Sequence, residues 1–205
     1  MRPKRMTRAE SRELTRRRLL DAAALSIAEK GLAATSVEDI AAQAGYTRGA
    51  FYSNFSSKCD LFVELLRLDH QNVQENLREL LDAKSSCEDF QQQIASLYTR
   101  RYRDGGNYVI WAEARLHAMR DAKFRQYMDA LCLEKRDMVA QLIEQFRTRL
   151  NLKLPALSAD QALAAIALMD SIVYFNMTMP DELPNTSAEA ILGNLLTRII
   201  SSPSA

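Results

Sequence analysis

Two glycines four residues apart set the tightest constraint on the fold of this 205-residue chain. Gly45 and Gly49 lie in the stretch TSVEDIAAQAGYTRGAFYSNFSSKCDLF, residues 35–62, which otherwise has the composition of short helices. A glycine inside a helix costs up to about 1 kcal/mol relative to alanine. The two positions therefore indicate a tight turn between helices and a place where another molecule approaches the backbone closely.

The residues around the glycines predict two short helices. A weak capping box begins at Ser36, and Gly45 closes the helix that follows it. Thr47 can cap a second helix, in which Phe51 and Phe55 are one turn apart and are expected to point into a core. Two short helices joined by a glycine-containing turn make a helix-turn-helix, whose second helix enters the major groove of DNA.

The rest of the chain has the apolar spacing of helices and no alternating strand pattern. We predict an all-α fold of about nine helices, with an N-terminal three-helix domain that contains the helix-turn-helix and a larger C-terminal bundle. Further capping boxes are expected to start helices at Ser85, Ser158 and Thr186. The expected helices are about 8–30, 37–44, 48–55, 58–81, 107–120, 121–150, 159–179 and 187–200, with one more between breaks at 85–88 and 105–106.

Charge is unevenly distributed along the chain. Residues 1–60 hold eleven Lys or Arg against seven Asp or Glu, whereas residues 61–205 hold sixteen against nineteen. Much of the positive charge lies in a segment at the N-terminus, which we call the basic arm. This arm indicates contact with a polyanion at one end of the molecule, although a frayed, solvated terminus is the alternative. Its basic residues are Arg2, Lys4, Arg5, Arg8, Arg12, Arg16, Arg17 and Arg18.

Composition limits the cellular setting. The N-terminus is a charged run with no apolar segment behind it, so we expect no signal peptide. Cys59, Cys87 and Cys132 are widely spaced and odd in number, which disfavours a disulfide framework or a zinc site. A reducing cytoplasm is therefore the expected location, without a membrane association.

The second short helix carries side chains suited to DNA. Arg48 and Tyr52, at i and i+4, are predicted to share an exposed face, and a guanidinium can bond guanine O6 and N7 as a pair. At Gly49 the missing side chain would let the start of the helix approach DNA closely. Lys58 and Thr35 flank the motif and are expected to hold backbone phosphates.

Residues 19–62 closely resemble the DNA-binding region of the TetR/AcrR family of bacterial transcriptional regulators. The family pattern is met at Thr35, Ile40-Ala41, Ala44-Gly45, Gly49, Tyr52, Phe55, Lys58 and Leu61. Tyr46 and Asn54 depart from it, since a small aliphatic residue and a histidine are usual there. The resemblance implies that Thr35, Arg48, Gly49, Tyr52, Asn54 and Lys58 lie at or near the DNA. Tyr46 and Thr47 are further candidates for DNA contact, with packing over the turn as the alternative for Tyr46.

A single short recognition helix reads too few base pairs for useful specificity, and such proteins usually bind two half-sites as dimers. Residues 162–179 are apolar on nearly all sides, so one face is expected to serve the chain's own core and another a second copy. Complete burial of this helix is the alternative. The resemblance implies a four-helix bundle from the last two helices of each copy. The predicted dimer residues are Ile166, Met169, Ile172, Val173, Leu192, Leu195 and Ile199.

The resemblance also implies a DNA-binding domain, residues 1–57, followed by a ligand-binding and dimerisation domain, residues 58–205. A small molecule in the second domain would alter the spacing of the two recognition helices. Some side chains are candidates to line a pocket for this small molecule, and ordinary packing in the core is the alternative for each of them. Among them, Arg115 is expected to meet an anionic group of the ligand. The candidates are Tyr102, Trp111, Arg115, His117, Tyr174 and Met177.

The sequence therefore predicts a homodimeric DNA-binding regulator, a repressor that leaves a palindromic operator when an effector binds. An enzyme is not expected, because His70 and His117 belong to no metal-spaced cluster or nucleophile motif, and no cofactor or metal is implied. A TetR-like activator and a helical adaptor that binds protein are the alternatives. The adaptor would not explain why the basic arm and the full motif occur together.

Overall fold

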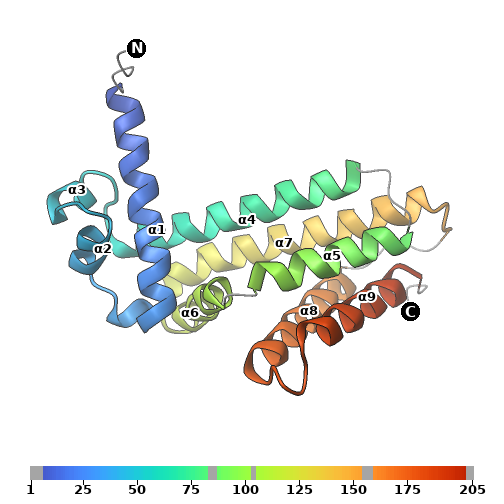
Figure 1. Ribbon diagram of the computed structural model, residues 1–205. Coiled ribbons are helices and arrows are strands. Elements are labelled where there is room, and N and C mark those ends of the chain that lie inside the picture. Colours follow the sequence, from blue (N-terminus) through green and yellow to red (C-terminus); the bar gives the residue numbers. More distant parts are fainter. Residues whose placement is uncertain (1–6, 83–86, 103–104, 154–158, 202–205) are drawn as a thin grey trace, which may run out of the picture. The chain divides into compact units, whose positions relative to one another are not determined.

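The computed structural model of the protein describes residues 7–82, 87–102, 105–153 and 159–201. These ranges contain nine helices and no strand, which confirms the predicted all-α fold (Figure 1). None of these helices is long and apolar enough to cross a membrane. The helices are α1 (Arg8–Ala34), α2 (Val37–Gln43), α3 (Arg48–Tyr52), α4 (Lys58–Asp82), α5 (Cys87–Tyr102), α6 (Gly106–Arg120), α7 (Ala122–Arg149), α8 (Ala159–Thr178) and α9 (Asn185–Ser201).

The chain folds into two compact units. Unit 1 comprises residues 1–69 and 105–128, and unit 2 comprises residues 70–104 and 129–205. Helices α4 and α7 each run from one unit into the other, whereas the remaining helices each lie within one unit. The sequence predicts a boundary between a DNA-binding and a ligand-binding domain after residue 57. This boundary differs from the one between the two compact units, and it stays a prediction.

Unit 1 is built around α1, which packs against α2 and α6. The inward face of α1 is fully buried at Leu19 and Ile27, as its helical spacing predicts. The rings of Phe62 on α4 and Phe124 on α7 stack with centroids 5.5 Å apart. The contacts of α1 with α2 and of α2 with α3 hold these two helices, which are too short to be stable alone.

Unit 2 has its own apolar core, in which Phe146 and Leu192 are completely buried. Helix α9 packs against both α5 and α8 (Figure 1). The buried guanidinium of Arg147 donates to the carbonyl oxygen of Ile199 at 2.8 Å and pairs with Glu144 at 3.1 Å. This arrangement satisfies a charge that would otherwise be costly to bury.

Two helix boundaries differ from the sequence prediction. Helix α3 ends at Tyr52 rather than near residue 55, because the chain turns there and Asn54 N–H donates to the Phe51 carbonyl at 2.9 Å. Helix α1 extends to Ala34 rather than to residue 30, although Gly31, with a φ of 82°, breaks the helical geometry at the predicted end.

The capping box predicted at Thr186 is wrong, because α9 already begins at Asn185. The Glu189 carboxylate expected in that box instead accepts a hydrogen bond from the buried hydroxyl of Thr99 on α5 at 2.7 Å. A tertiary partner therefore takes the place of the local one. The boxes predicted at Ser85 and Ser158 lie outside the described residues.

Candidate nucleic-acid interface

Helix α2 begins with the predicted capping box. The Ser36 hydroxyl accepts from Asp39 N–H at 3.0 Å, and the Asp39 carboxylate accepts from Ser36 N–H at 2.9 Å. Lys30 on α1 also pairs with Asp39 at 2.9 Å. The Lys30 ammonium first, and then the Ser36 donors, hold the pKa of Asp39 well below its ordinary value. These contacts fix the start of the helix-turn-helix to α1.

The low pKa of Asp39 predicts a loss of stability in acid. A carboxylate with a pKa lower in the folded than in the unfolded chain stabilises the fold above the unfolded value, and this contribution fades as pH falls through the folded value. We expect the melting temperature of the wild type to fall more steeply below pH 3.8 than that of Asp39→Asn, which cannot titrate. Circular dichroism melts from neutral pH downwards test this. Parallel profiles for the two proteins would contradict it.

The turn between α2 and α3 requires Gly45. This residue has a φ of 76°, in the left-handed region where a side chain is strained. A Cβ added there would have no heavy atom within 4 Å, so the constraint is the backbone angle and not space. Tyr46 N–H donates to the Ala41 carbonyl at 2.8 Å and closes the turn. The interpretation of Gly45 as the turn residue is confirmed.

Gly49 is different, because the fold itself leaves room for a side chain. It lies within α3 with an ordinary helical φ, and it is exposed. A Cβ added there would be 3.7 Å from the Thr47 hydroxyl oxygen, an ordinary van der Waals contact. The chain's own packing therefore gives no reason for a glycine at this position.

The exposed face of α3 carries Arg48 and Tyr52. The Arg48 guanidinium pairs with Glu38 of α2 at 3.1 Å and lies 5.5 Å from the centroid of the Tyr52 ring. Both members of the ion pair are largely exposed, so the pair contributes little stability, but it orients the guanidinium. Phe51 of the same helix is fully buried. Glu38 was not predicted, because no local spacing links it to Arg48 across the turn.

Tyr46 and Thr47, which directly precede Arg48, complete this surface. Thr47 caps α3, since its hydroxyl accepts from Ala50 N–H at 3.3 Å. Tyr46 is half-buried beside α1, and a hydrogen bond with Thr15, followed by the charge of Arg18, lowers the pKa of its phenol. Arg18 itself is exposed.

Three of the predicted DNA-contacting residues have polar atoms engaged within the protein. The Lys58 ammonium donates to the carbonyl oxygens of Leu32 and Thr35, at 2.7 and 2.6 Å. Thr35 is buried, and its hydroxyl donates to the Gly31 carbonyl at 2.8 Å. The Asn54 amide donates to Ala50 at 2.8 Å, and its side-chain oxygen is buried with no partner in the described part of the chain. These side chains hold the motif in place.

Arg16 also has a structural role that was not predicted. It was expected in a free basic arm, yet its guanidinium donates to the Asn54 carbonyl at 2.6 Å, pairs with Glu64 of α4, and lies 4.4 Å from the Phe55 ring centroid. Arg16 thus joins α1 to the turn after α3. Of the other arm residues, Arg8, Arg12, Arg17 and Arg18 are exposed, and Arg2, Lys4 and Arg5 lie outside the described residues.

The residues that build this motif match a known protein family. The sequence profile described as "Bacterial regulatory proteins, tetR family" matches residues 19–65, from the middle of α1 to the start of α4. Over these residues the chain is similar to the TetR family.

Curated proteins similar to this chain are regulators that match mainly its N-terminal part. The HTH-type transcriptional regulator AcrR of Shigella flexneri is 42% identical over 71 residues, which cover 35% of this chain and 33% of AcrR. The HTH-type transcriptional repressor KstR2 of Rhodococcus jostii (strain RHA1) is 30% identical over 133 residues, 63% of each chain. The chain thus spans only about a third of the length of AcrR.

Solved structures of similar fold cover nearly the whole chain. Salmonella enterica GusR has a TM-score of 0.76 at 17% identity and covers 97% of this chain and 100% of its own. The transcriptional regulator FadR of Bacillus subtilis, solved in complex with stearoyl-CoA, has a TM-score of 0.73 at 20% identity and covers 90% and 97%. At these identities the likeness shows the fold.

The predicted dimer residues serve the core of unit 2. Ile166, Met169, Val173 and Leu192 are buried, and Ile172, Leu195 and Ile199 are half-buried against the same core. The opposite face of α8 is exposed, and from Leu163 to Thr178 it carries no charged residue, whereas the exposed Asp160 lies one turn before Leu163. Its members are Leu163, Ala164, Ala167, Leu168, Ser171, Tyr174, Phe175 and Thr178, which we call the α8 outer face.

The six predicted ligand residues do not form one described pocket. Trp111, Arg115 and His117 belong to unit 1, where Trp111 Nε1 donates to Asp69 at 2.5 Å and the His117 ring lies 4.7 Å from that of Phe124. Tyr102, Tyr174 and Met177 belong to unit 2, and Tyr102 is buried beside Tyr98, whereas Tyr174 is exposed on the α8 outer face.

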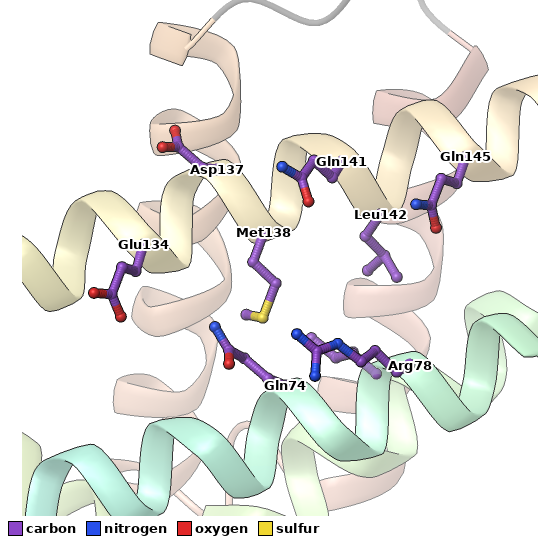
Figure 2. Close-up of a pocket in the computed structure, with 9 residues that line it drawn as sticks. Gln74, Arg78, Glu134, Asp137, Met138, Gln141, Leu142 and Gln145 are labelled. Atoms are coloured by element: carbon purple, nitrogen blue, oxygen red, sulfur yellow. The ribbon is translucent and has the colours of Figure 1, made fainter.

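Unit 2 instead has a groove of about 310 Å³ between α4 and α7 (Figure 2). The Arg78 side chain extends into the gap between the two helices, toward Met138. At the other end Gln74 and Glu134 both reach the buried His70, at 3.3 and 3.5 Å. The polar residues of this groove were not predicted, although Gln74 and Arg78 are spaced one helical turn apart.

Proposed function

We propose that this protein is a sequence-specific DNA-binding repressor that binds a palindromic operator as a homodimer in the cytoplasm and leaves it when a small molecule binds. The observation that carries the proposal is the exposed start of α3, where a glycine that the fold does not need is next to an oriented arginine. The similarity to AcrR and to the repressor KstR2 supports this function.

The proposed contacts with DNA divide into two groups. Arg48 is proposed to read a base through its paired N–H donors, while Tyr52 packs on a thymine methyl or reaches a phosphate. Gly49 is proposed to lie against the DNA backbone, where a side chain would collide. The remaining predicted residues would position this face. They are Thr35, Tyr46, Thr47, Asn54 and Lys58, of which Lys58 keeps one N–H for a phosphate because two are donated to carbonyls.

The α8 outer face is proposed as the centre of the dimer interface, in place of the seven residues predicted from the sequence. A face of this extent without charge is unusual for a surface exposed to water, and such patches mark sites of association. Leu163 and Leu168 are 53% and 51% exposed, and Tyr174 and Phe175 are 45% and 46% exposed. A two-fold interface would cover these side chains in both copies.

The response to a small molecule is proposed to reside in unit 2. The fold neighbour FadR of Bacillus subtilis was solved with stearoyl-CoA, which supports a ligand-responsive fold. The groove between α4 and α7 is the candidate effector site there, and its volume of about 310 Å³ suits a small ligand. A coupling of about 1–3 kcal/mol between effector and operator is enough for a switch.

Selection from random duplex DNA tests the proposal. We expect a palindromic sequence to be enriched, and its affinity to fall as salt rises, because phosphate contacts release counterions. Enrichment of no sequence, with weak binding at every salt concentration, would favour the protein-binding adaptor.

Arg48→Ala tests the base contact on the selected operator. Loss of a bidentate contact with guanine is expected to cost on the order of 1–3 kcal/mol of binding free energy and to relax the preference at one base pair of each half-site. Affinities of the two proteins for the operator and for single-base variants, measured by fluorescence anisotropy, check this. A uniform loss for all sequences would instead assign Arg48 to a phosphate.

A further inference from the structure

Unit 1 contains a small cavity that is not among the sites described above. Its volume is about 220 Å³, and its walls come from the end of α1, the start of α4 and one side of α6. The lining combines apolar side chains with the charged side chains of Lys58, Glu113 and Arg120. The lining residues are Leu32, Ala33, Lys58, Cys59, Glu113, Leu116, His117 and Arg120.

Two charged residues of this cavity also hold the segment that leads into α2. Lys58 donates to the carbonyl oxygens of Leu32 and Thr35, and the Glu113 carboxylate accepts from Leu32 N–H at 3.1 Å. The approach of Glu113 is close, since a Cβ on Gly31 would be 3.1 Å from its Oε1 atom. The position of the segment before the helix-turn-helix therefore depends on two side chains that line the cavity.

The charge of the cavity is incompletely neutralised. Lys58 is half-buried, its two contacts are neutral carbonyls, and no carboxylate of the described residues pairs with it. Burial lowers the pKa of Lys58, which reflects the cost of holding this charge away from water. Arg120 adds a second cation, and Glu113 is the one acid among the lining residues. Buried charges are normally paired, so an anion would be favoured here.

The surroundings of Cys59 shift the pKa of its thiol. Burial first, and then Asp121 and Asp60, raise the pKa of its thiol, while Lys123 lowers it. The thiol is therefore largely protonated and contributes an apolar surface to the cavity wall. Together with Leu32 and Leu116 it would contact the apolar part of a ligand.

We propose that this cavity is a regulatory site for a small organic anion with a compact apolar body, such as an aromatic carboxylate, and that its occupancy weakens operator binding. The carboxylate pairs with Lys58 and Arg120, and the apolar body lies against Leu32, Leu116 and Cys59. An anion that draws the Lys58 ammonium away from the Leu32 and Thr35 carbonyls releases the segment that positions α2. The effect of the anion on operator binding rests on the proposed DNA-binding function, whereas the binding of the anion to the cavity does not.

Cysteine protection in the full-length protein tests the site with benzoate as the probe. Alkylation of each cysteine by iodoacetamide is followed by peptide mass spectrometry. We expect benzoate to slow alkylation of Cys59 several-fold, while the exposed Cys132 reacts at an unchanged rate. Benzamide, which has the same ring without the charge, should not protect. Unchanged Cys59 reactivity, or equal protection by benzamide, would overturn the proposed anion site.

A matched variant and an operator titration complete the test. Arg120→Gln removes a cation from the exposed edge of the cavity, so we expect it to reduce the protection by benzoate. At constant ionic strength benzoate should raise the operator Kd of the wild type several-fold, and this ratio should approach one in Arg120→Gln. Protection without any change in operator Kd would overturn the regulatory role. Absence of operator binding without benzoate would instead count against the proposed function, and the protection assay would still decide the site.

Discussion

Gly49→Ala is expected to leave the protein folded and to impair operator binding severely. The added methyl group meets only the Thr47 hydroxyl oxygen, at 3.7 Å, and alanine is favoured over glycine inside a helix. The free energy of unfolding should therefore stay the same or rise by up to about 1 kcal/mol. On DNA the same methyl group is forced against a phosphate or a base edge. Overpacking of this kind costs roughly 1–3 kcal/mol at each recognition helix.

The measurement pairs a denaturation curve with an operator titration. Gly193→Ala provides the control, because a Cβ on this α9 glycine would have no heavy atom within 4 Å and would cause no clash. The control changes helix propensity in the same way but lies in unit 2. We expect operator Kd to rise about tenfold or more for Gly49→Ala and to stay constant for Gly193→Ala. Wild-type affinity in Gly49→Ala would mean that DNA does not approach this part of α3.

Leu168→Glu is expected to convert the proposed dimer into a monomer. Leu168 is 51% exposed on the α8 outer face, so glutamate is tolerated in a single copy. In a two-fold interface, each copy would bury an unpaired carboxylate, at a cost of several kcal/mol. The dimer Kd should rise by about a hundredfold or more. Operator binding should fall with it, because each copy reads one half-site.

Leu133→Glu is the matched control for this change. Leu133 is 49% exposed on α7 of the same unit, and it lies outside the α8 outer face. Sedimentation equilibrium on the three proteins distinguishes the outcomes. A wild-type dimer that persists in Leu168→Glu and dissociates in Leu133→Glu would move the interface away from α8.

Local patterns in the sequence were sufficient for the fold class and for the helix-turn-helix. Ser36 and Asp39 form the capping box that their spacing predicts, and Gly45 has the positive φ expected at the turn. Phe51 is buried as its position in the apolar pattern requires. These features depend on residues within a few positions of one another, so the sequence contains the whole of their physical cause.

Tertiary contacts decide which polar side chains are free to bind a partner. Arg16 and Lys58 have the composition of a phosphate-binding surface, but carbonyl and carboxylate partners 23 to 48 residues away engage them. Glu38 of α2 pairs with Arg48 of α3 inside the motif, and Glu113 of α6 holds Leu32 in the segment before the motif. No local spacing encodes such pairs, because they form only when separate helices are brought together.

The sequence likewise did not predict which face of α8 is buried in the core. A helix that is apolar on nearly all sides has no preferred face, so its pattern does not tell which residues enter the core. Ile166 and Met169 are buried, and Leu163 and Leu168 are exposed, although all four are equally apolar in kind. The sequence by itself determined that α8 is a helix with more apolar surface than one core needs. Only packing against the core of unit 2 decided which surface is left over, because burial depends on the neighbouring helices and not on the residue type alone.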